Sequence, residues 1–142
     1  QHCPSSKAQT MNSALLCLAL TVYYEARGEI PDGQIAVAET VINRVEDHRW
    51  PDSVCGVVTQ NRHPASLHRC QFSFYCDGQP EQPGDAIAWQ QAKDIAEAVM
   101  KGDLYLGVEA THYHTTDTRP AWADSMESLG KVGDHVFYLE AP

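Results

Sequence analysis

Hydrophobic positions recur along the chain with helical spacing, and in the first such stretch they surround the helix almost completely. The apolar run from Ala14 to Leu20 predicts a helix over residues 7–27 that is buried instead of amphipathic. Gly28 and Pro31 mark its end, because glycine readily takes the left-handed conformation that closes a helix. Glu25 therefore falls in the last turn of a buried helix.

A second helical pattern follows directly. One apolar stripe consists of Ile35, Ala38, Ile42 and Val45, which Val37 and Val41 widen. We expect Asp32 to cap this helix, and its end to lie near His48, because the proline of Trp50-Pro51 restricts the residue before it. Asn43 is expected to hydrogen-bond the backbone of a neighbouring loop, and Arg44 to pair with an acid of the first helix.

The remaining pattern predicts shorter elements. Asp52-Ser53 precedes an apolar helical turn, Cys70 to Cys76 alternates enough for a hairpin or extended segment, and Asp77-Gly78 is a turn signal. A longer helix is expected over 85–101, with Gly102 as its stop. Extended pieces are expected at 104–106, 110–114 and 135–139, an irregular arm at 1–5, an exposed loop at 60–69, and a loop with one helical turn at 115–133. The predicted fold is α+β, a mainly helical domain with a small antiparallel sheet, in which residues 1–142 form a single domain.

Composition narrows the class of protein. With 142 residues and a hydrophobic fraction of 43%, the chain is long enough for one globular core. Its net charge of −9, from 19 acidic and 10 basic residues, argues against nucleic acid or an anionic membrane as the partner. The apolar run at 14–22 is too short to span a bilayer and lacks a signal-peptide cleavage site, so a soluble protein is expected.

The 5 cysteines favour an oxidising compartment, and their odd number leaves at least one thiol free in an exported protein. Cys70 and Cys76 flank a short segment, and a hairpin there would bring their side chains face to face, so we expect a disulfide between them. Cys17 lies in the apolar run and is expected to be a buried thiol. Cys3 and Cys55 either pair with each other or stay free.

Glu25 is the main candidate for chemistry. The dipole of its helix disfavours the carboxylate by only about 0.3–1 kcal/mol, which is less than one pKa unit. Partial burial would have to supply the rest of an upward shift of its pKa. A glutamic acid that keeps its proton near neutral pH is what cleavage of a glycosidic bond requires. The competing interpretation is a surface glutamate paired with Arg27.

Other nucleophiles and a metal have weaker support. His112 and His114 would share one face of a strand, and His135 or Glu25 could add a third ligand, but the chain has no HExxH motif. Hydrogen-bonding or surface roles for these histidines are therefore preferred. The serines lie in no GxSxG turn, and pairing with Cys76 is a better use of Cys70 than nucleophilic catalysis.

A set of aromatic and polar residues could bind a sugar, because aromatic rings pack on its CH-rich faces and amides or hydroxyls bind its rim. These residues are Gln71, Phe72, Ser73, Tyr75 and Tyr113. Phe74 and Phe137 are expected to be core residues.

The chain resembles the SleB/CwlJ-type cell-wall hydrolases in stretches that occur in the same order from about residue 16 to 138. They are 24–29 (YEARGE), 36–45 (AVAETVINRV), 50–58 (WPDSVCGVV), 71–78 (QFSFYCDG), 110–114 (ATHYH), 120–122 (PAW) and 133–138 (GDHVFY). Cys70 stands where many spore-type members have glycine, and this form is more similar to members from Gram-negative bacteria or their phages.

The resemblance implies a lysozyme-like, lytic-transglycosylase-related fold that cleaves peptidoglycan, with Glu25 as the catalytic acid. It implies that Gln71, Phe72 and Ser73 line one wall of a substrate-binding cleft and that His112 and Tyr113 line the opposite wall. We expect no metal and no cofactor. The expected partner is the glycan strand of peptidoglycan. We expect a monomer that is exported to the periplasm or cell wall, or delivered there by a phage.

The reaction depends on whether Glu25 acts with a second carboxylate, which hydrolases place roughly 5–9.5 Å from the first. The candidates are Glu29, Asp77, Asp117 and Asp134, and none stands out. A lone acid suits a lytic transglycosylase that cleaves the MurNAc–GlcNAc β-1,4 bond, which is the favoured function. The alternatives are a muramidase-type hydrolase, a metal-dependent amidase that uses His112 and His114, and a non-catalytic glycan-binding module.

Overall fold

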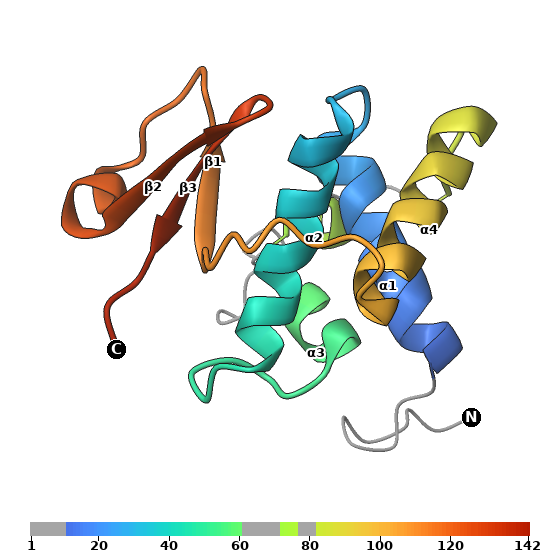
Figure 1. Cartoon of the computed structure of the whole chain (residues 1–142), viewed down its shortest axis with the longest axis horizontal. Coiled ribbons are helices and arrows are strands. Elements are labelled where there is room, and N and C mark those ends of the chain that lie inside the picture. Colours follow the sequence, from blue (N-terminus) through green and yellow to red (C-terminus); the bar gives the residue numbers. More distant parts are fainter. Residues whose placement is uncertain (1–10, 61–71, 77–81) are drawn as a thin grey trace.

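The computed structural model describes residues 11–60, 72–76 and 82–142 (Figure 1). The predicted arm at 1–5, nearly all of the loop at 60–69, the turn at Asp77-Gly78 and the Cys70–Cys76 disulfide fall outside these ranges. Within them the fold is α+β, with helices on one side and a small antiparallel sheet on the other (Figure 1). The predicted fold class is confirmed.

The helices are α1 (Met11–Ala26), α2 (Pro31–Val45), α3 (Val54–Val58) and α4 (Ala86–Lys101). Ser53 caps α3 by accepting from the backbone N–H of Gly56 at 3.0 Å, and Gly102 ends α4 at a φ of 80°. The prediction that Asp32 caps α2 is wrong. Pro31 takes the first helical position, where its missing N–H is harmless and its fixed φ suits a helix, so Asp32 lies inside the first turn. The helix also ends at Val45, before His48.

The main core lies between α1, α2, α3 and α4. Its fully buried side chains include Leu18, Val22, Tyr23, Val41 and Val57. A smaller core joins the helices to the sheet, where Phe137 packs against Ala26, Ala36 and Val37. The end of α1 is thereby fixed against the sheet, and this contact decides where Glu25 lies.

The sheet contains β1 (His112–Thr115), β2 (Glu127–Val132) and β3 (His135–Leu139), in the order β1-β3-β2. Tyr113 pairs with Phe137 in the register of β1 and β3. The bounds of β3 match the prediction, whereas β2 falls in the predicted loop at 115–133. This edge strand is polar and mostly exposed, so it lacks the alternation that indicates a strand. The helical turn expected there is present as the 3-10 helix η3 (Ala121–Ser125).

Two further segments differ from their expected conformation. Residues Ser73–Cys76 form the 3-10 helix η2 and no hairpin, and 104–106 is not a strand. Instead the carboxylate of Glu39, which is buried, accepts from the backbone N–H groups of Leu106, Gly107 and Val108 at 2.7–3.2 Å. These bonds replace the ladder bonds that a strand would have made.

The segment from α4 to β1, drawn in orange, crosses α2 before it enters the sheet (Figure 1). The prediction that Asn43 binds a neighbouring loop is confirmed, since its Nδ2 donates to the carbonyl oxygens of Val108 and Ala110, each at 2.8 Å. Arg44 Nε donates to the carbonyl of Thr111 at 2.7 Å. These bonds hold the start of β1 against α2.

A disulfide joins Cys17 of α1 to Cys55 of α3. The prediction that Cys17 is a buried free thiol is therefore wrong, and so are both alternatives for Cys55, pairing with Cys3 and a free thiol. Cys17 lies on the side of α1 that packs against α3, a relation that the apolar pattern of α1 alone does not reveal. In the described residues, no helix is both long and apolar enough to cross a membrane.

Candidate active site

Glu25 is the second-last residue of α1, and the chain turns immediately after it at Gly28, where φ is 85°. Its side chain is half-buried beside the face of the sheet that packs on the helices. There the hydroxyl of Tyr113, from β1, donates to Glu25 Oε1 at 2.6 Å. Arg27 instead donates to the hydroxyl of Tyr23, so it is not the partner that a surface Glu25 would have had.

Burial raises the pKa of Glu25 above its ordinary value of 4.5. The hydrogen bond from Tyr113 and the electrostatic effects of His135 and Arg44 oppose this rise in the pKa of Glu25, and the charge of Glu29 adds to it. The expectation that burial raises this pKa is confirmed. The pKa of the Tyr113 hydroxyl is itself raised well above 10.0 by burial and by the adjacent carboxylate, so the hydroxyl remains a donor.

Glu29 lies on the other side of Gly28 and turns toward β3. Its Oε2 is 2.9 Å from His135 Nδ1, and both side chains are almost fully buried. The imidazole nitrogen is not aligned for a hydrogen bond to this oxygen, so the contact is electrostatic. Glu29 Oε1 accepts from the backbone N–H of Asp134 at 2.8 Å. Both carboxylate oxygens of Glu29 are thus engaged with β3 and the turn before it.

The other candidate carboxylates do not gather at Glu25. Asp117 is exposed and accepts from the hydroxyl of Thr115. Asp134 is also exposed, and its backbone N–H, described above, is what binds Glu29. Asp77 lies outside the described residues.

His112 and His114 point to the opposite face of the sheet from Tyr113. The ring of Trp122 lies 5.3 Å from the ring of His112 and 5.8 Å from that of His114. His114 Nε2 is 2.9 Å from the hydroxyl of Tyr138, and His112 Nδ1 is 3.0 Å from that of Thr111. Within the described ranges, no three His, Cys, Asp or Glu side chains form a group that could hold a metal ion.

The proposed substrate-binding residues are therefore spread over several environments. Tyr113 touches Glu25, whereas His112 is half-buried on the far face of the sheet. Phe72 is only 3% exposed and lies in the core, and Tyr75 is 45% exposed. Gln71 and the side chain of Ser73 are outside the part that the structure describes.

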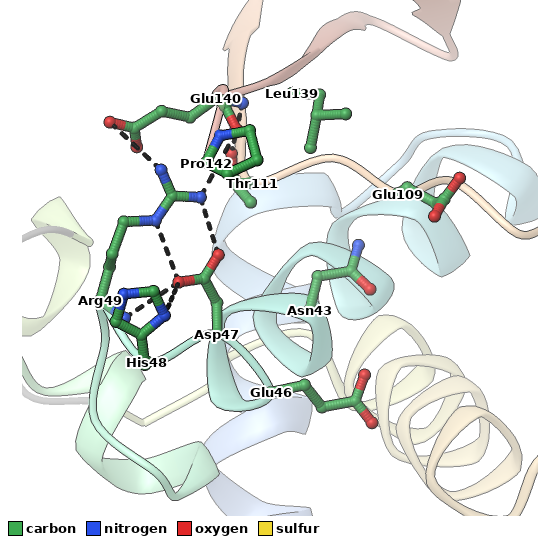
Figure 2. Close-up of a pocket in the computed structure, with 10 residues that line it drawn as sticks. All are labelled: Asn43, Glu46, Asp47, His48, Arg49, Glu109, Thr111, Leu139, Glu140 and Pro142. Atoms are coloured by element: carbon green, nitrogen blue, oxygen red, sulfur yellow. Dashed lines mark hydrogen bonds and ion pairs between the residues drawn. The ribbon is translucent and has the colours of Figure 1, made fainter.

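A cavity of about 410 Å³ opens at the C-terminal end of α2, and its lining does not include Glu25 (Figure 2). Arg49 reaches across it, with Nη2 2.7 Å from Asp47 Oδ2 and Nη1 2.7 Å from the carbonyl of Ala141. Figure 2 shows the guanidinium of Arg49 between Asp47 and the segment that carries Glu140. This guanidinium lowers the pKa of Asp47 to about 2. The arrangement holds residues 140–141 against the end of α2, which is a structural role.

Sequence reasoning missed the contact between Glu29 and His135. Each residue was considered separately, Glu29 as a second carboxylate and His135 as a metal ligand. The signal that could have joined them is a pair of glycines, Gly33 and Gly133, because a Cβ at either position would lie within 2.7 Å of Glu29 Oε1. A glycine at each place leaves room for this buried carboxylate.

Comparison with known proteins places the chain in a known class. The family model of the cell wall hydrolases matches residues 28–138, which begins just after Glu25. The chain belongs to this family, in agreement with its resemblance to the SleB/CwlJ-type enzymes.

Particular relatives include the spore cortex-lytic enzyme of Bacillus subtilis, which is 32% identical over 131 residues, and that of Halalkalibacterium halodurans, 33% identical over 121 residues. These matches cover 89% and 84% of the chain, but only 37% and 33% of the relatives, so the chain spans about a third of their length.

Two solved structures are also similar. One is the catalytic domain of the germination-specific lytic transglycosylase SleB from Bacillus anthracis, with a TM-score of 0.71, 28% identity, and coverage of 92% of this chain and 96% of that one. The other is the catalytic domain of SleB from Bacillus cereus, with a TM-score of 0.67, 26% identity, and coverage of 92% of each chain.

Proposed function

We propose that the chain is a catalytic unit that cleaves the MurNAc–GlcNAc β-1,4 bond of peptidoglycan as a lytic transglycosylase, with Glu25 as its one catalytic carboxyl group. The observation that carries this proposal is the environment of Glu25. Its carboxyl group is half-buried with a raised pKa and has one strong donor, Tyr113 at 2.6 Å, while the neighbouring acid Glu29 is engaged elsewhere. The similarity to a lytic transglycosylase catalytic domain supports the same reaction.

In the first step, protonated Glu25 donates its proton to the glycosidic oxygen as the C1–O4 bond breaks. The raised pKa keeps a fraction of Glu25 protonated at higher pH than an exposed glutamic acid would be. The carboxylate that results then accepts the proton of the muramoyl 6-hydroxyl, whose oxygen attacks the anomeric carbon. The product carries a 1,6-anhydro ring, and Glu25 is protonated again.

Tyr113 serves this cycle by stabilising the intermediate state. Its hydroxyl donates to Glu25 Oε1, and a hydrogen bond to a charged oxygen is stronger than one to a neutral group. The bond therefore strengthens when Glu25 becomes the carboxylate, between the two proton transfers. Arg44, whose positive charge also lowers the pKa of Glu25, acts in the same direction.

Glu29 is a poor second carboxylate for a hydrolase. Its side chain is 7% exposed, Oε1 accepts a backbone hydrogen bond, and Oε2 faces His135. A base that activates water, or a nucleophile that attacks the sugar, needs an oxygen that reaches the substrate. The muramidase-type reaction therefore has less support than the reaction with one acid.

The substrate and the disulfide both support the proposed location outside the cytoplasm. Peptidoglycan lies outside the cytoplasm, and a disulfide such as Cys17–Cys55 persists in oxidising compartments. Export to the periplasm or cell wall, or delivery by a phage, would place the enzyme there.

The test is turnover of purified peptidoglycan by the Glu25→Gln variant, which keeps the shape of the side chain and removes its acid. We expect turnover to fall to less than a few per cent of wild type, with the far-UV spectrum retained and a melting temperature no lower than that of wild type. Asp117→Asn is the matched control. This acid is exposed and binds the hydroxyl of Thr115, so the variant should retain activity. Substantial turnover by Glu25→Gln would remove Glu25 from the proposed role.

A further inference from the structure

We propose that His135 and Glu29 are positioning residues, which hold the ring of Tyr113 so that its hydroxyl stays on the Glu25 carboxyl group. This inference rests on the proposed function of Glu25 and extends it to two residues that do not touch the reacting atoms. Tyr113 donates to Glu25, and three further contacts fix its ring. The ring of Tyr113 packs on that of His135, His135 faces Glu29, and Glu29 accepts from the backbone N–H of Asp134.

The first contact in this series is between two rings. The centroids of the Tyr113 and His135 rings are 4.9 Å apart, with an angle of 81° between their planes, which is the favourable edge-to-face geometry. Phe137, which lies directly opposite Tyr113 on β3, also packs against the Tyr113 ring, with centroids 5.6 Å apart. The tyrosine hydroxyl thus reaches Glu25 from a ring whose place is set by β3.

The second contact fixes His135. Its side chain is 3% exposed, and its Nδ1 lies 2.9 Å from Glu29 Oε2. A buried polar group needs a polar partner, because burial removes its contacts with water. Glu29 supplies this partner, so the place of the imidazole depends on the place of one carboxylate.

The third contact fixes Glu29, and it is built into the backbone. The N–H of Asp134 donates to Glu29 Oε1 at 2.8 Å. A Cβ at Gly33 would come within 2.7 Å of the same oxygen, and one at Gly133 within 2.5 Å. Gln34 Nε2 also donates to the backbone carbonyl of Glu29 at 3.0 Å. The carboxylate therefore occupies a space that only glycine leaves open on both sides.

The charged and titratable groups that act on Glu25 come from four parts of the fold. They are Glu29 from the α1–α2 connection, Arg44 from α2, Tyr113 from β1 and His135 from β3. Glu29 is the one negative group in this set. Its carboxylate oxygens contact His135 and the backbone of Asp134, and the hydroxyl of Tyr113 is the group that contacts Glu25 directly.

The experiment is a double-mutant cycle on peptidoglycan cleavage, with kcat and KM measured across pH for His135→Gln, Tyr113→Phe and the double variant. We expect His135→Gln to lower kcat by about tenfold at most, no more than the loss of the Tyr113 hydroxyl itself, with KM within about twofold. Because His135 acts through Tyr113, the loss should be much smaller in the Tyr113→Phe background. His114→Gln, on the other face of the same sheet, is the matched control and should behave as wild type.

A second variant covers the case in which His135→Gln fails to fold. Gly33→Ala adds one methyl group in a helix, where alanine is favoured, and it displaces the flexible end of Glu29. We expect the same fall in kcat and the same dependence on Tyr113. Equal losses in both backgrounds, or unchanged kcat in a folded His135→Gln or Gly33→Ala variant, would overturn the inference.

These outcomes are separate from failure of the proposed function. If Glu25→Gln is active, the proposed function is wrong whatever the other variants do. If Glu25→Gln is inactive and the cycle shows no coupling, only the positioning role is wrong.

Discussion

Replacing Tyr113 by phenylalanine removes one hydroxyl and leaves the ring against His135 and Phe137. The lost hydrogen bond is short, at 2.6 Å, and it stabilises the carboxylate form of Glu25. A hydrogen bond to a charged group contributes about 1.5–3 kcal/mol, and 1.36 kcal/mol corresponds to about one pKa unit. Glu25 is half-buried, so water can partly replace the lost hydroxyl. We therefore take the lower end of this energy range, which corresponds to a change of about one unit in the pKa of Glu25.

The sign of the change follows from which form the hydroxyl stabilises. The bond lowers the pKa of Glu25, so its loss lets burial raise that pKa further. The acid form then persists to higher pH, and the alkaline limb of the kcat/KM profile should move up by about one pH unit. The plateau of kcat should fall, because the carboxylate formed after the first proton transfer has lost its donor.

The assay is the pH dependence of kcat/KM for release of soluble fragments from peptidoglycan, with wild type and Tyr113→Phe measured side by side. Tyr105→Phe is the matched control, because this tyrosine is 79% exposed and should leave the profile unchanged. An alkaline limb that stays in place or moves down, in a variant with an unaltered melting temperature, would refute the reasoning about Tyr113.

Two further predictions concern stability. Replacing both Cys17 and Cys55 by alanine opens a loop with a sequence separation of 38, which should lower stability by about 4 kcal/mol and the melting temperature by about 10–15 °C. A melt that is the same for this variant, reduced wild type and oxidised wild type would contradict a stabilising disulfide. Glu25→Gln should be more stable than wild type at neutral pH, because a carboxyl with a raised pKa contributes stability below pH 4.5 that is lost as pH rises through its folded pKa. Urea unfolding at pH 4 and pH 7 should show the advantage of the variant only at the higher pH, and an equal advantage at both would count against burial of Glu25.

The sequence predicted those parts of the fold whose hydrophobic pattern, or a nearby glycine, indicates a helix or strand and its end. The apolar run and Gly28 placed the end of α1, and with it Glu25, to within one residue. The sequence pattern also predicted the bounds of β3 and the backbone-binding role of Asn43. In each case the residues that determine the structure lie near one another in the chain or have a single plausible use.

The features that sequence reasoning missed depend on contacts between distant segments. Cys17 and Cys55 are paired because α1 packs on α3, and the apolar pattern of α1 indicates only that Cys17 is buried. Glu29 meets the turn before β3 across a separation of 105 residues, in a space left by two glycines. The hydrophobic pattern of a segment does not indicate which distant residue it contacts, and none of these residues stands out within its own segment.

The central claim is that Glu25 cleaves the glycan strand without a second carboxylate. The chemical form of the muramic ends in the products tests this claim directly. Mass spectrometry of the fragments released from purified peptidoglycan by the wild-type chain should show 1,6-anhydro-muramic ends, and the Glu25→Gln reaction should show none. Reducing muramic ends in the wild-type digest would contradict the account, because they require attack by water and therefore a different arrangement of catalytic groups.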